Sequence, residues 1–239
     1  VFLQPDINKK SMKKKLLMAF AIVTIIGMVA VPSMAQVKYA VSGTYTEDGK
    51  KVYLIDQLTE KAIDRVVVAD GKFAFTGTAD KDDLMGVKAE QAQWTTPFFN
   101  DGTPIIINVN DSTLKGSPLN ERLTKLDIEM DLPQKMLSKK TANMTEAEIR
   151  AHQDELMGDM NKMIDSMIAF ANKVFKEERN SLIPVAFSSY YFIDNGVEAY
   201  DELVKENVVF ANHPFLKKTR DYVEAATKPK DSPKTAIIG

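Results

Sequence analysis

Cysteine is absent from all 239 residues of the chain, and histidine occurs only as His152 and His213. Without cysteine the chain can form no disulfide, so packing alone must hold its core, and its own residues can carry out no thiol chemistry. A lipid anchor on a cysteine is excluded for the same reason. The two histidines do not form the H-x-x-x-H or Cys/His pattern of a zinc or iron site. We therefore assign the chain no metal and no cofactor.

The motifs of several enzyme classes are missing, and so is any excess of positive charge. The sequence contains no G-x-S-x-G elbow, no P-loop and no G-x-G-x-x-G turn. Its net charge is −2, so nucleic acid is not an expected partner. The residues identify no catalytic group, and they leave open whether the chain is an enzyme.

Residues 12–35 have the three parts of a secretory signal peptide in order. Lys13–Lys15 are positively charged, Leu16–Val31 are almost entirely apolar, and Ser33-Met34-Ala35 form a cleavage site before Gln36. A membrane anchor is the competing interpretation, but the apolar run is shorter than the roughly 20 residues that a spanning helix needs. We predict export to the periplasm, cleavage, and no stable membrane anchor afterwards.

Cleavage after Ala35 removes five Lys and one Asp, which changes the net charge from −2 to −6. A net negative charge favours solubility and does not favour docking on an anionic membrane. Because Val1 is not an initiator methionine, we expect residues 1–11 to precede the true start at Met12, or the reading frame to be cut there.

Residues 36–116 have the pattern of short β-strands. Apolar and polar residues alternate over 37–45, and further strand-like runs occupy 51–56, 63–69, 72–78 and 105–107. Three Asp-Gly pairs stand between apolar runs and predict tight hairpin turns: Asp48-Gly49, Asp70-Gly71 and Asp101-Gly102. The pattern predicts an antiparallel β-sandwich or open barrel.

Helical periodicity begins at residue 117 and continues to residue 226. Ser117 is a good N-cap before Pro118, and apolar residues then recur at helical spacing up to Pro133, which we expect to end or kink the helix. Thr145 and Glu148 form a capping box. We predict a helix over 146–179 that folds back on 118–140 as a long αα-hairpin.

The predicted hairpin has two mostly apolar series that step by seven residues, and three shorter helices follow it. The series are Ile149, Leu156, Met163 and Phe170, and Gln153, Met160, Met167 and Val174. The later helices are expected over 182–193, 197–206 and 214–226. The fold class is therefore α+β, with a β-rich part (36–116), a helical part (117–226) and a linker (227–239).

Four methionines, Met157, Met160, Met163 and Met167, lie on adjacent turns of the predicted helix. Thioether ligands select Cu(I), so a copper site is one interpretation. The other is that methionine fills irregular gaps in the seam between two helices. We favour packing, because most of these residues lie on or beside the apolar seam.

Acidic clusters and one aromatic cluster are the remaining candidates for a site. Asp80, Asp82 and Asp83 are close in sequence, as are Glu177 and Glu178, but nothing pairs them across a cleft as a glycosidase requires, and a solvated loop is the simpler interpretation. The aromatic cluster contains Trp94, Phe98 and Phe99. These three residues are our candidate binding surface, and the alternative is a core cluster at the edge of a strand.

The segments GTYTEDGKKVYLIDQLTEKAIDRVVVADGKFAFTG (43–77) and FFNDGTPIIINVNDSTLKGSPLNERL (98–123) resemble an uncharacterised N-terminal domain. This domain is found on exported thioredoxin-like proteins of Gram-negative gut bacteria. The GSPLN transition (116–120), the N-x-x-x-P turn (180–184) and the late His213-Pro214 pair match it in order and spacing. The resemblance covers most of residues 37–226.

The resemblance implies a thioredoxin-like domain of the thiol–disulfide interchange (AhpC/TSA) type after the linker. That domain carries the Cys-x-x-Cys motif in the family, whereas this chain has no cysteine, so no catalytic residue is carried over. We expect a non-catalytic periplasmic accessory domain, cut before its C-terminal thioredoxin-like partner. The alternatives are a complete exported binding or scaffold protein without redox activity, and an enzyme that uses carboxylates.

Overall fold

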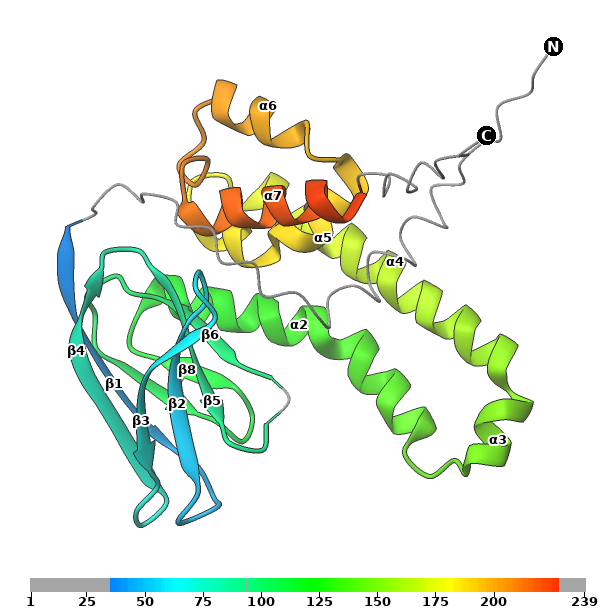
Figure 1. Cartoon of the computed structure of the whole chain (residues 1–239), viewed down its shortest axis with the longest axis horizontal. Helices are drawn as coiled ribbons and strands as arrows, with labels where there is room; N and C mark the ends of the chain where they lie inside the picture. Colours follow the sequence, from blue (N-terminus) through cyan, green and yellow to red (C-terminus); the bar gives the residue numbers. More distant parts are fainter. Residues whose placement is uncertain (1–34, 93, 228–239) are drawn as a thin grey trace, which may run out of the picture.

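The computed structural model describes residues 35–92 and 94–227. The predicted signal peptide up to residue 34 and the predicted linker from residue 228 therefore lie outside the described residues. Two four-stranded sheets come first in the chain and helices follow (Figure 1). The predicted α+β class and the N-terminal sandwich are confirmed.

Each sheet combines strands that are distant in the sequence. The first has the order β4-β1-β7-β8 and contains β1 (Gln36–Thr44), β4 (Lys72–Asp80), β7 (Ile105–Asn108) and β8 (Thr113–Lys115). The second has the order β3-β2-β5-β6 and contains β2 (Lys51–Asp56), β3 (Lys61–Val67), β5 (Leu84–Ala89) and β6 (Thr96–Phe99). Neighbouring strands are antiparallel except β1 and β7, which are parallel.

The core of the sandwich lies between the two sheets, because alternate residues of each strand point inward. Phe73 and Phe75 of β4 are both buried, with their ring centroids 5.8 Å apart. The other buried contributors come from both sheets: Tyr39, Val41, Val52, Leu54, Met85, Val87, Phe98, Ile105, Ile107 and Leu114. One face of the second sheet contributes Leu84 and Phe99 to a different core, which it shares with the helices.

The three Asp-Gly pairs make turns, but none of them joins two strands of the same sheet. Asp48-Gly49 connects β1 to β2, Asp70-Gly71 connects β3 to β4, and Asp101-Gly102 connects β6 to β7. At the second pair both residues have positive φ, and Ala69 and Lys72 exchange backbone hydrogen bonds of 3.1 and 3.0 Å. The strands then diverge into opposite sheets. The tight turn predicted at Asp70-Gly71 is therefore confirmed. None of the three pairs joins strands of one sheet, because a tight turn fixes the reversal of the chain and not the partner of the next strand.

The helical part begins with a hairpin of two long helices. Its elements are α2 (Pro118–Thr141), α3 (Glu146–Ala151), α4 (Gln153–Glu177), η1 (Ile183–Phe187), α5 (Ser188–Asn195), α6 (Ala199–Lys205) and α7 (Pro214–Thr227). The Ser117 N-cap and the Thr145–Glu148 capping box are both confirmed. Pro133 lies inside α2 and does not end it.

The predicted continuous helix over 146–179 is wrong, because the chain breaks at His152 between α3 and α4. His152 has φ −105° and ψ 18°, which is not helical geometry. No glycine or proline marks the break in the sequence. Helix α3 buries none of its residues, so no packing holds it in line with α4.

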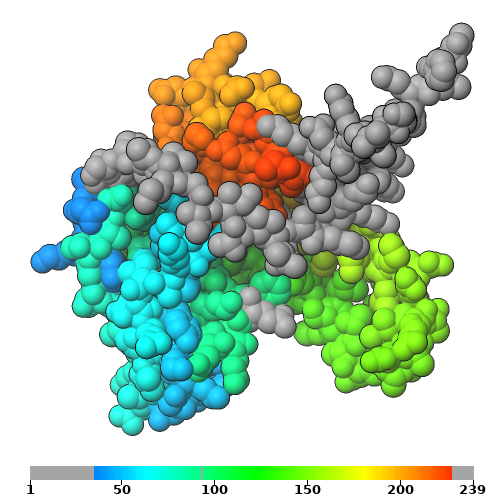
Figure 2. Space-filling view, in the orientation of Figure 1, coloured from blue at the N-terminus to red at the C-terminus, as the bar shows by residue number. Residues whose placement is uncertain are grey.

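Only part of the helical hairpin packs against the rest of the molecule. Met130 of α2 and Met167 of α4 are buried, and beyond them, toward the tip, no residue of either helix is fully buried. We call residues 131–166 the hairpin arm. Figure 1 shows the arm projecting away from the other helices, and Figure 2 shows a hollow between it and the sandwich.

The helices and one face of the second sheet enclose a second core, which we call the helical core, and aromatic side chains fill much of it. Phe175 of α4 stacks on Tyr191 of α5 at 3.7 Å and meets Phe210 edge-on at 5.4 Å. Leu123, Leu126, Phe187, Phe192, Leu216 and Val223 complete this core together with Leu84 and Phe99 of the second sheet. Across residues 35–92 and 94–227, we find no helix with the length and apolar character needed to cross a membrane.

Candidate functional site

The structure separates the three aromatic residues of the candidate binding surface. Phe98 and Phe99 are neighbours on β6, so their side chains point to opposite faces of the sheet. Phe98 enters the sandwich core and Phe99 enters the helical core, and both are buried. Trp94 precedes the strand and is 62% exposed. Of the three residues only Trp94 is left at the surface, and a binding role for it stays a prediction.

Asn120, in the first turn of α2, joins the helical part to the second sheet. Its Oδ1 accepts a hydrogen bond from the Phe99 N–H at 2.7 Å, and its Nδ2 donates to the Phe99 carbonyl at 2.9 Å. The side-chain amide thereby replaces a neighbouring strand at the edge of β6. Ser117 accepts from both nitrogens of Asn120 and donates to Asp101. Nothing in the sequence marks Asn120 for this role, although the GSPLN transition contains it.

His213 makes a second junction between the sandwich and the helices, and its ring meets the Phe99 ring edge-on at 5.9 Å. Its Nδ1 accepts from the Phe215 N–H at 3.1 Å at the start of α7, and its Nε2 lies 2.9 Å from the Asp82 carbonyl oxygen. A carbonyl only accepts, so Nε2 carries the proton and the ring is neutral. Burial lowers the pKa of His213, against a smaller opposite effect of its contact with Asp82. The histidine is therefore structural in this arrangement.

The acidic stretch between β4 and β5 is part of this junction. Asp80, Asp82 and Asp83 are partly buried, so this stretch is less exposed than the expected solvated loop. Burial, with the neighbouring carboxylates of Asp80 and Asp56, raises the pKa of Asp83 to about 6. The backbone of Asp82 and Asp83 pairs with that of Asn100 through two hydrogen bonds of 2.9 Å. The stretch therefore pairs with the residue that follows β6, and the Asp82 carbonyl connects it to His213.

A second pair of carboxylates lies on α2, at a position that the sequence analysis did not single out. Asp127 and Asp131 are one turn apart on the helix, and both are partly buried. Burial, and then the charge of Asp131, raise the pKa of Asp127 to about 7. Burial also raises the pKa of Asp131, and burial and Asp131 raise the pKa of Tyr190 on α5. A strongly shifted pKa is typical of functional groups, but structural clusters show it as well.

The geometry of this pair does not match the carboxylate chemistry considered for the sequence. A glycosidase holds its two carboxyl groups on opposite sides of a bound sugar. Asp127 and Asp131 lie four positions apart on one helix, so they share a face. Within the described part of the chain, no group of three His, Asp or Glu residues is placed to hold a metal ion.

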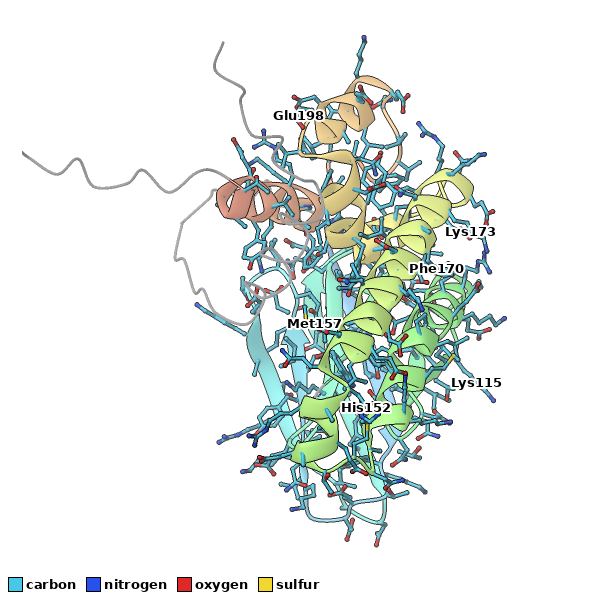
Figure 3. The ribbon with its side chains drawn as sticks, turned by 90° about the vertical axis from the view of Figure 1, so that its right-hand side faces the viewer. Lys115, His152, Met157, Phe170, Lys173 and Glu198 are labelled. Carbon is cyan, nitrogen blue, oxygen red and sulfur yellow. The ribbon has the colours of Figure 1, made fainter. Side chains whose placement is uncertain are left out.

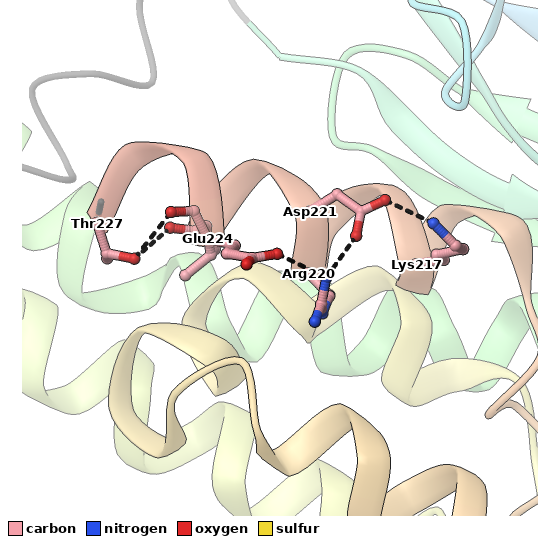
Figure 4. Close-up of polar contacts among 6 residues, drawn as sticks. Lys217, Arg220, Asp221, Glu224 and Thr227 are labelled. Atoms are coloured by element: carbon pink, nitrogen blue, oxygen red, sulfur yellow. Dashed lines mark hydrogen bonds and ion pairs between the residues drawn. The ribbon is translucent and has the colours of Figure 1, made fainter. Parts of the chain in front are cut away.

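The charged residues of α7 mostly interact with one another. Lys217 pairs with Asp221 at 2.7 Å, and Arg220 pairs with Asp221 at 3.0 Å and with Glu224 at 2.6 Å (Figure 4). Lys218 reaches Glu60, next to β3, at 2.6 Å. Such partly exposed pairs hold the helix in place and contribute little stability each. They do not form a free charged surface for an anionic ligand.

The surface of the hairpin arm differs from that of α7, because the arm exposes large apolar side chains. On α2, Leu132 is 50% exposed and Met136, one turn further on, is 71% exposed. Ile149 of α3 and Met157 and Met160 of α4 are exposed as well. In Figure 3, His152 and Met157 lie toward the tip of the arm, and Phe170 and Lys173 lie further along α4. An apolar surface on a projecting element is typical of a contact with another molecule.

Residues 39–123 match the model of a family described as a domain of unknown function (DUF4369). The matched segment runs from β1 through the sandwich into α2, so it contains the Asn120–Phe99 junction and ends before the hairpin arm. A search of curated proteins gave no match to the chain.

Proposed function

We propose that the chain is a non-catalytic accessory module of an exported thioredoxin-like thiol–disulfide oxidoreductase. The match of residues 39–123 to a domain of unknown function supports a module shared among several proteins. The resemblance described above supports the thioredoxin-like partner. Because the chain contains no cysteine, any thiol–disulfide exchange must take place on another domain.

The observation that carries a binding role is the exposure of Leu132 and Met136 on the hairpin arm. Both belong to α2, whose earlier turns bury Leu123, Leu126 and Met130 in the helical core. At helical spacing Leu132 and Met136 lie on a different face of α2 from these three buried residues, and the fold leaves both exposed. Burying such side chains contributes about 25 cal/mol per Å² of apolar surface. A protein surface placed against the arm would remove this area from water.

The gene itself provides the most direct test. The proposal predicts that the reading frame continues beyond the codon for Gly239 into a thioredoxin-like sequence with a Cys-x-x-Cys motif. A stop codon at that position would contradict it and would favour the alternative, a complete exported binding or scaffold protein. Export is tested separately by N-terminal sequencing of the protein from the periplasm, where we expect Gln36 as the first residue.

The role of the arm is tested with the downstream domain as the probe. We expect Leu132→Glu with Met136→Glu to weaken the association of the chain with that domain at least tenfold in calorimetry. Lys125→Glu, an exposed change on α2 outside the arm, is the matched control for altered charge. Equal affinity of the double variant and the wild type would remove the arm from the proposed interface.

A further inference from the structure

The methionine row on α4 is packed between helices only at its inner end. Met167 is buried, and Met163 packs partly buried against the helical core. Met157 and Met160, nearer the tip of the arm, are 39% and 49% exposed. The expectation that these four residues fill a seam between helices is therefore wrong for the outer two. Packing among the described residues does not account for this exposed pair.

The exposed pair continues the face of α4 that is buried nearer its C-terminal end. Met160 lies seven positions before the buried Met167, and the half-buried Ile164 lies four positions before the buried Ile168. Met157 lies seven positions before Ile164. Residues at these spacings share one face of a helix. We call Met157, Met160 and Ile164 the α4 shelf.

Helix α5 covers the same face of α4 where that face is buried. Phe175, seven positions after Ile168, stacks on Tyr191 of α5 at 3.7 Å. Figure 1 shows α4 running on past α5 toward the tip of the arm. The α4 shelf therefore lies beyond the end of the helix that covers this face. A second helix laid on the shelf would contact α4 on the face that α5 contacts.

Acidic side chains border the α4 shelf. Asp154 and Asp165 are exposed, and each lies about a quarter turn round α4 from the shelf. Neither carboxylate has a hydrogen bond or an ion pair with another residue in the described ranges. At the inner end, Asp131 of α2 lies near Tyr190 of α5, because burial and then the charge of Asp131 raise the pKa of that tyrosine. The border of the shelf therefore complements positive charge.

We propose that the α4 shelf binds an amphipathic helix of another polypeptide, with the apolar row of that helix on the shelf and its Lys or Arg side chains beside Asp154 and Asp165. A helix docks in this way through apolar residues at positions i, i+3, i+4 and i+7. Methionine suits such a surface, because its flexible side chain adapts to partners of different shape. Acidic residues that flank an apolar row pair with basic residues of the facing helix, as in a coiled coil. The shelf belongs to α4, so it is a different surface from Leu132 and Met136 of α2.

The test uses the whole chain and a synthetic amphipathic peptide of leucine and lysine, about four helical turns long. The methyl groups of the methionines are labelled with ¹³C. We expect the peptide to shift the resonances of Met157 and Met160 and to leave those of Met85 and Met136 in place. A peptide of the same composition in scrambled order should cause no such shifts.

The apolar contact is tested by calorimetry with the same peptide. Met157→Gln with Met160→Gln should weaken the affinity by about tenfold, because two side chains of the shelf no longer offer apolar surface. Val204→Gln with Val209→Gln changes an exposed apolar pair elsewhere, and this matched control should keep the wild-type affinity. All four positions are exposed, so both variants should fold, which circular dichroism checks.

The acidic border is tested with Asp154→Asn and Asp165→Asn combined. We expect this variant to bind the leucine–lysine peptide more weakly than the wild type does. The two proteins should bind equally a peptide in which glutamine replaces every lysine, because no charge then faces the border.

Several outcomes would overturn the proposal. They are wild-type affinity in the methionine double variant, equal binding of the ordered and scrambled peptides, and equal shifts at Met136 and Met157. Deletion of residues 228–239 should leave the Met157 and Met160 resonances in place. If the deletion moves them as far as the peptide does, the chain covers its own shelf and the proposal fails. None of these results bears on the contact proposed for Leu132 and Met136, so the two proposals fail separately.

Discussion

The side-chain amide of Asn120 forms two hydrogen bonds with the backbone of Phe99, one to its N–H and one to its carbonyl. Both residues are buried. A single side chain at the start of α2 therefore completes the ladder at the edge of β6 and fixes the first helix on the sandwich. This contact lies inside the segment that matches a domain of unknown function.

Replacement of Asn120 by alanine should be strongly destabilising. It leaves the N–H and the carbonyl of Phe99 buried without partners, and each such group costs about 1–3 kcal/mol. We expect the free energy of unfolding of Asn120→Ala, measured in urea, to fall by roughly 3 kcal/mol. Asn110→Ala, at an exposed asparagine bonded to Thr46, should lose less than about 1 kcal/mol. Equal losses in the two variants would show that the junction does not depend on Asn120.

The loss of stability on replacement by alanine should be large for Phe98 and Phe99 and small for Trp94. Removal of a buried phenylalanine typically costs about 3–5 kcal/mol, and an exposed change costs about 0.5 kcal/mol or less. We expect Phe98→Ala and Phe99→Ala each to lower the urea midpoint markedly, and Trp94→Ala to leave it almost unchanged. A large loss for Trp94→Ala would contradict its exposed position.

His213 should make the protein less stable as the pH falls below neutrality. The pKa of this histidine is lowered in the folded protein, so the unfolded chain takes up the proton first, near its ordinary value of about 6.5. The stabilisation from the neutral ring is complete above that pH. It is lost as the pH falls through this value toward the lower pKa of the folded state.

The variant His213→Gln isolates this effect. Its free energy of unfolding should depend less on pH between pH 7.5 and pH 5 than that of the wild type. His152 is exposed, and its Nδ1 lies 2.9 Å from the carbonyl oxygen of Glu148. His152→Gln should therefore keep the wild-type slope. If both variants keep it, the buried histidine does not control the pH dependence.

Asp127 should make the protein less stable as the pH rises, which is the opposite of the effect of His213, over a similar pH range. Its pKa rises from an ordinary 3.8 to about 7 in the folded protein, so the folded state holds the proton longer. Stability should therefore fall as the pH rises from about 4 to about 7. Above that range the ionised carboxylate carries its full burial penalty.

Asp127→Asn removes this penalty. We expect the variant to be more stable than the wild type at pH 8, by about 1–3 kcal/mol after allowance for solvent around a partly exposed group, and to lose this advantage near pH 4. Asp165→Asn, at an exposed position on α4, should show no such gain. A constant difference between Asp127→Asn and wild type at pH 4 and pH 8 would contradict the raised pKa.

Features that depend on a few neighbouring residues were predictable. Ser117 caps α2 through an N–H three residues away, and Thr145 and Glu148 cap α3 in the same way. The alternation of β4, the positions of the Asp-Gly turns and the pairing of α2 with α4 also follow from local pattern. The strand at 84–89 was missed, because a strand buried on both faces does not alternate in polarity.

The burial and exposure of individual side chains depend on contacts between residues that are distant in the sequence. Phe98 and Phe99 have the same chemistry in the sequence, and only the packing of helices on the second sheet sends them into different cores. Met160 and Met167 hold the same position in one heptad series, but the body of the molecule covers only Met167. The exposure of the arm could not be obtained from periodicity.

The sequence by itself therefore determined where elements start, where the chain turns, and that no thiol chemistry can occur on this chain. The tertiary structure alone decided which sheet each strand joins, that the helix breaks at His152, and how deeply Asp127 and His213 are buried. Caps and turns are set by hydrogen bonds within about four residues, which the sequence displays directly. Burial and sheet partnership depend on surfaces that meet only when the chain has folded.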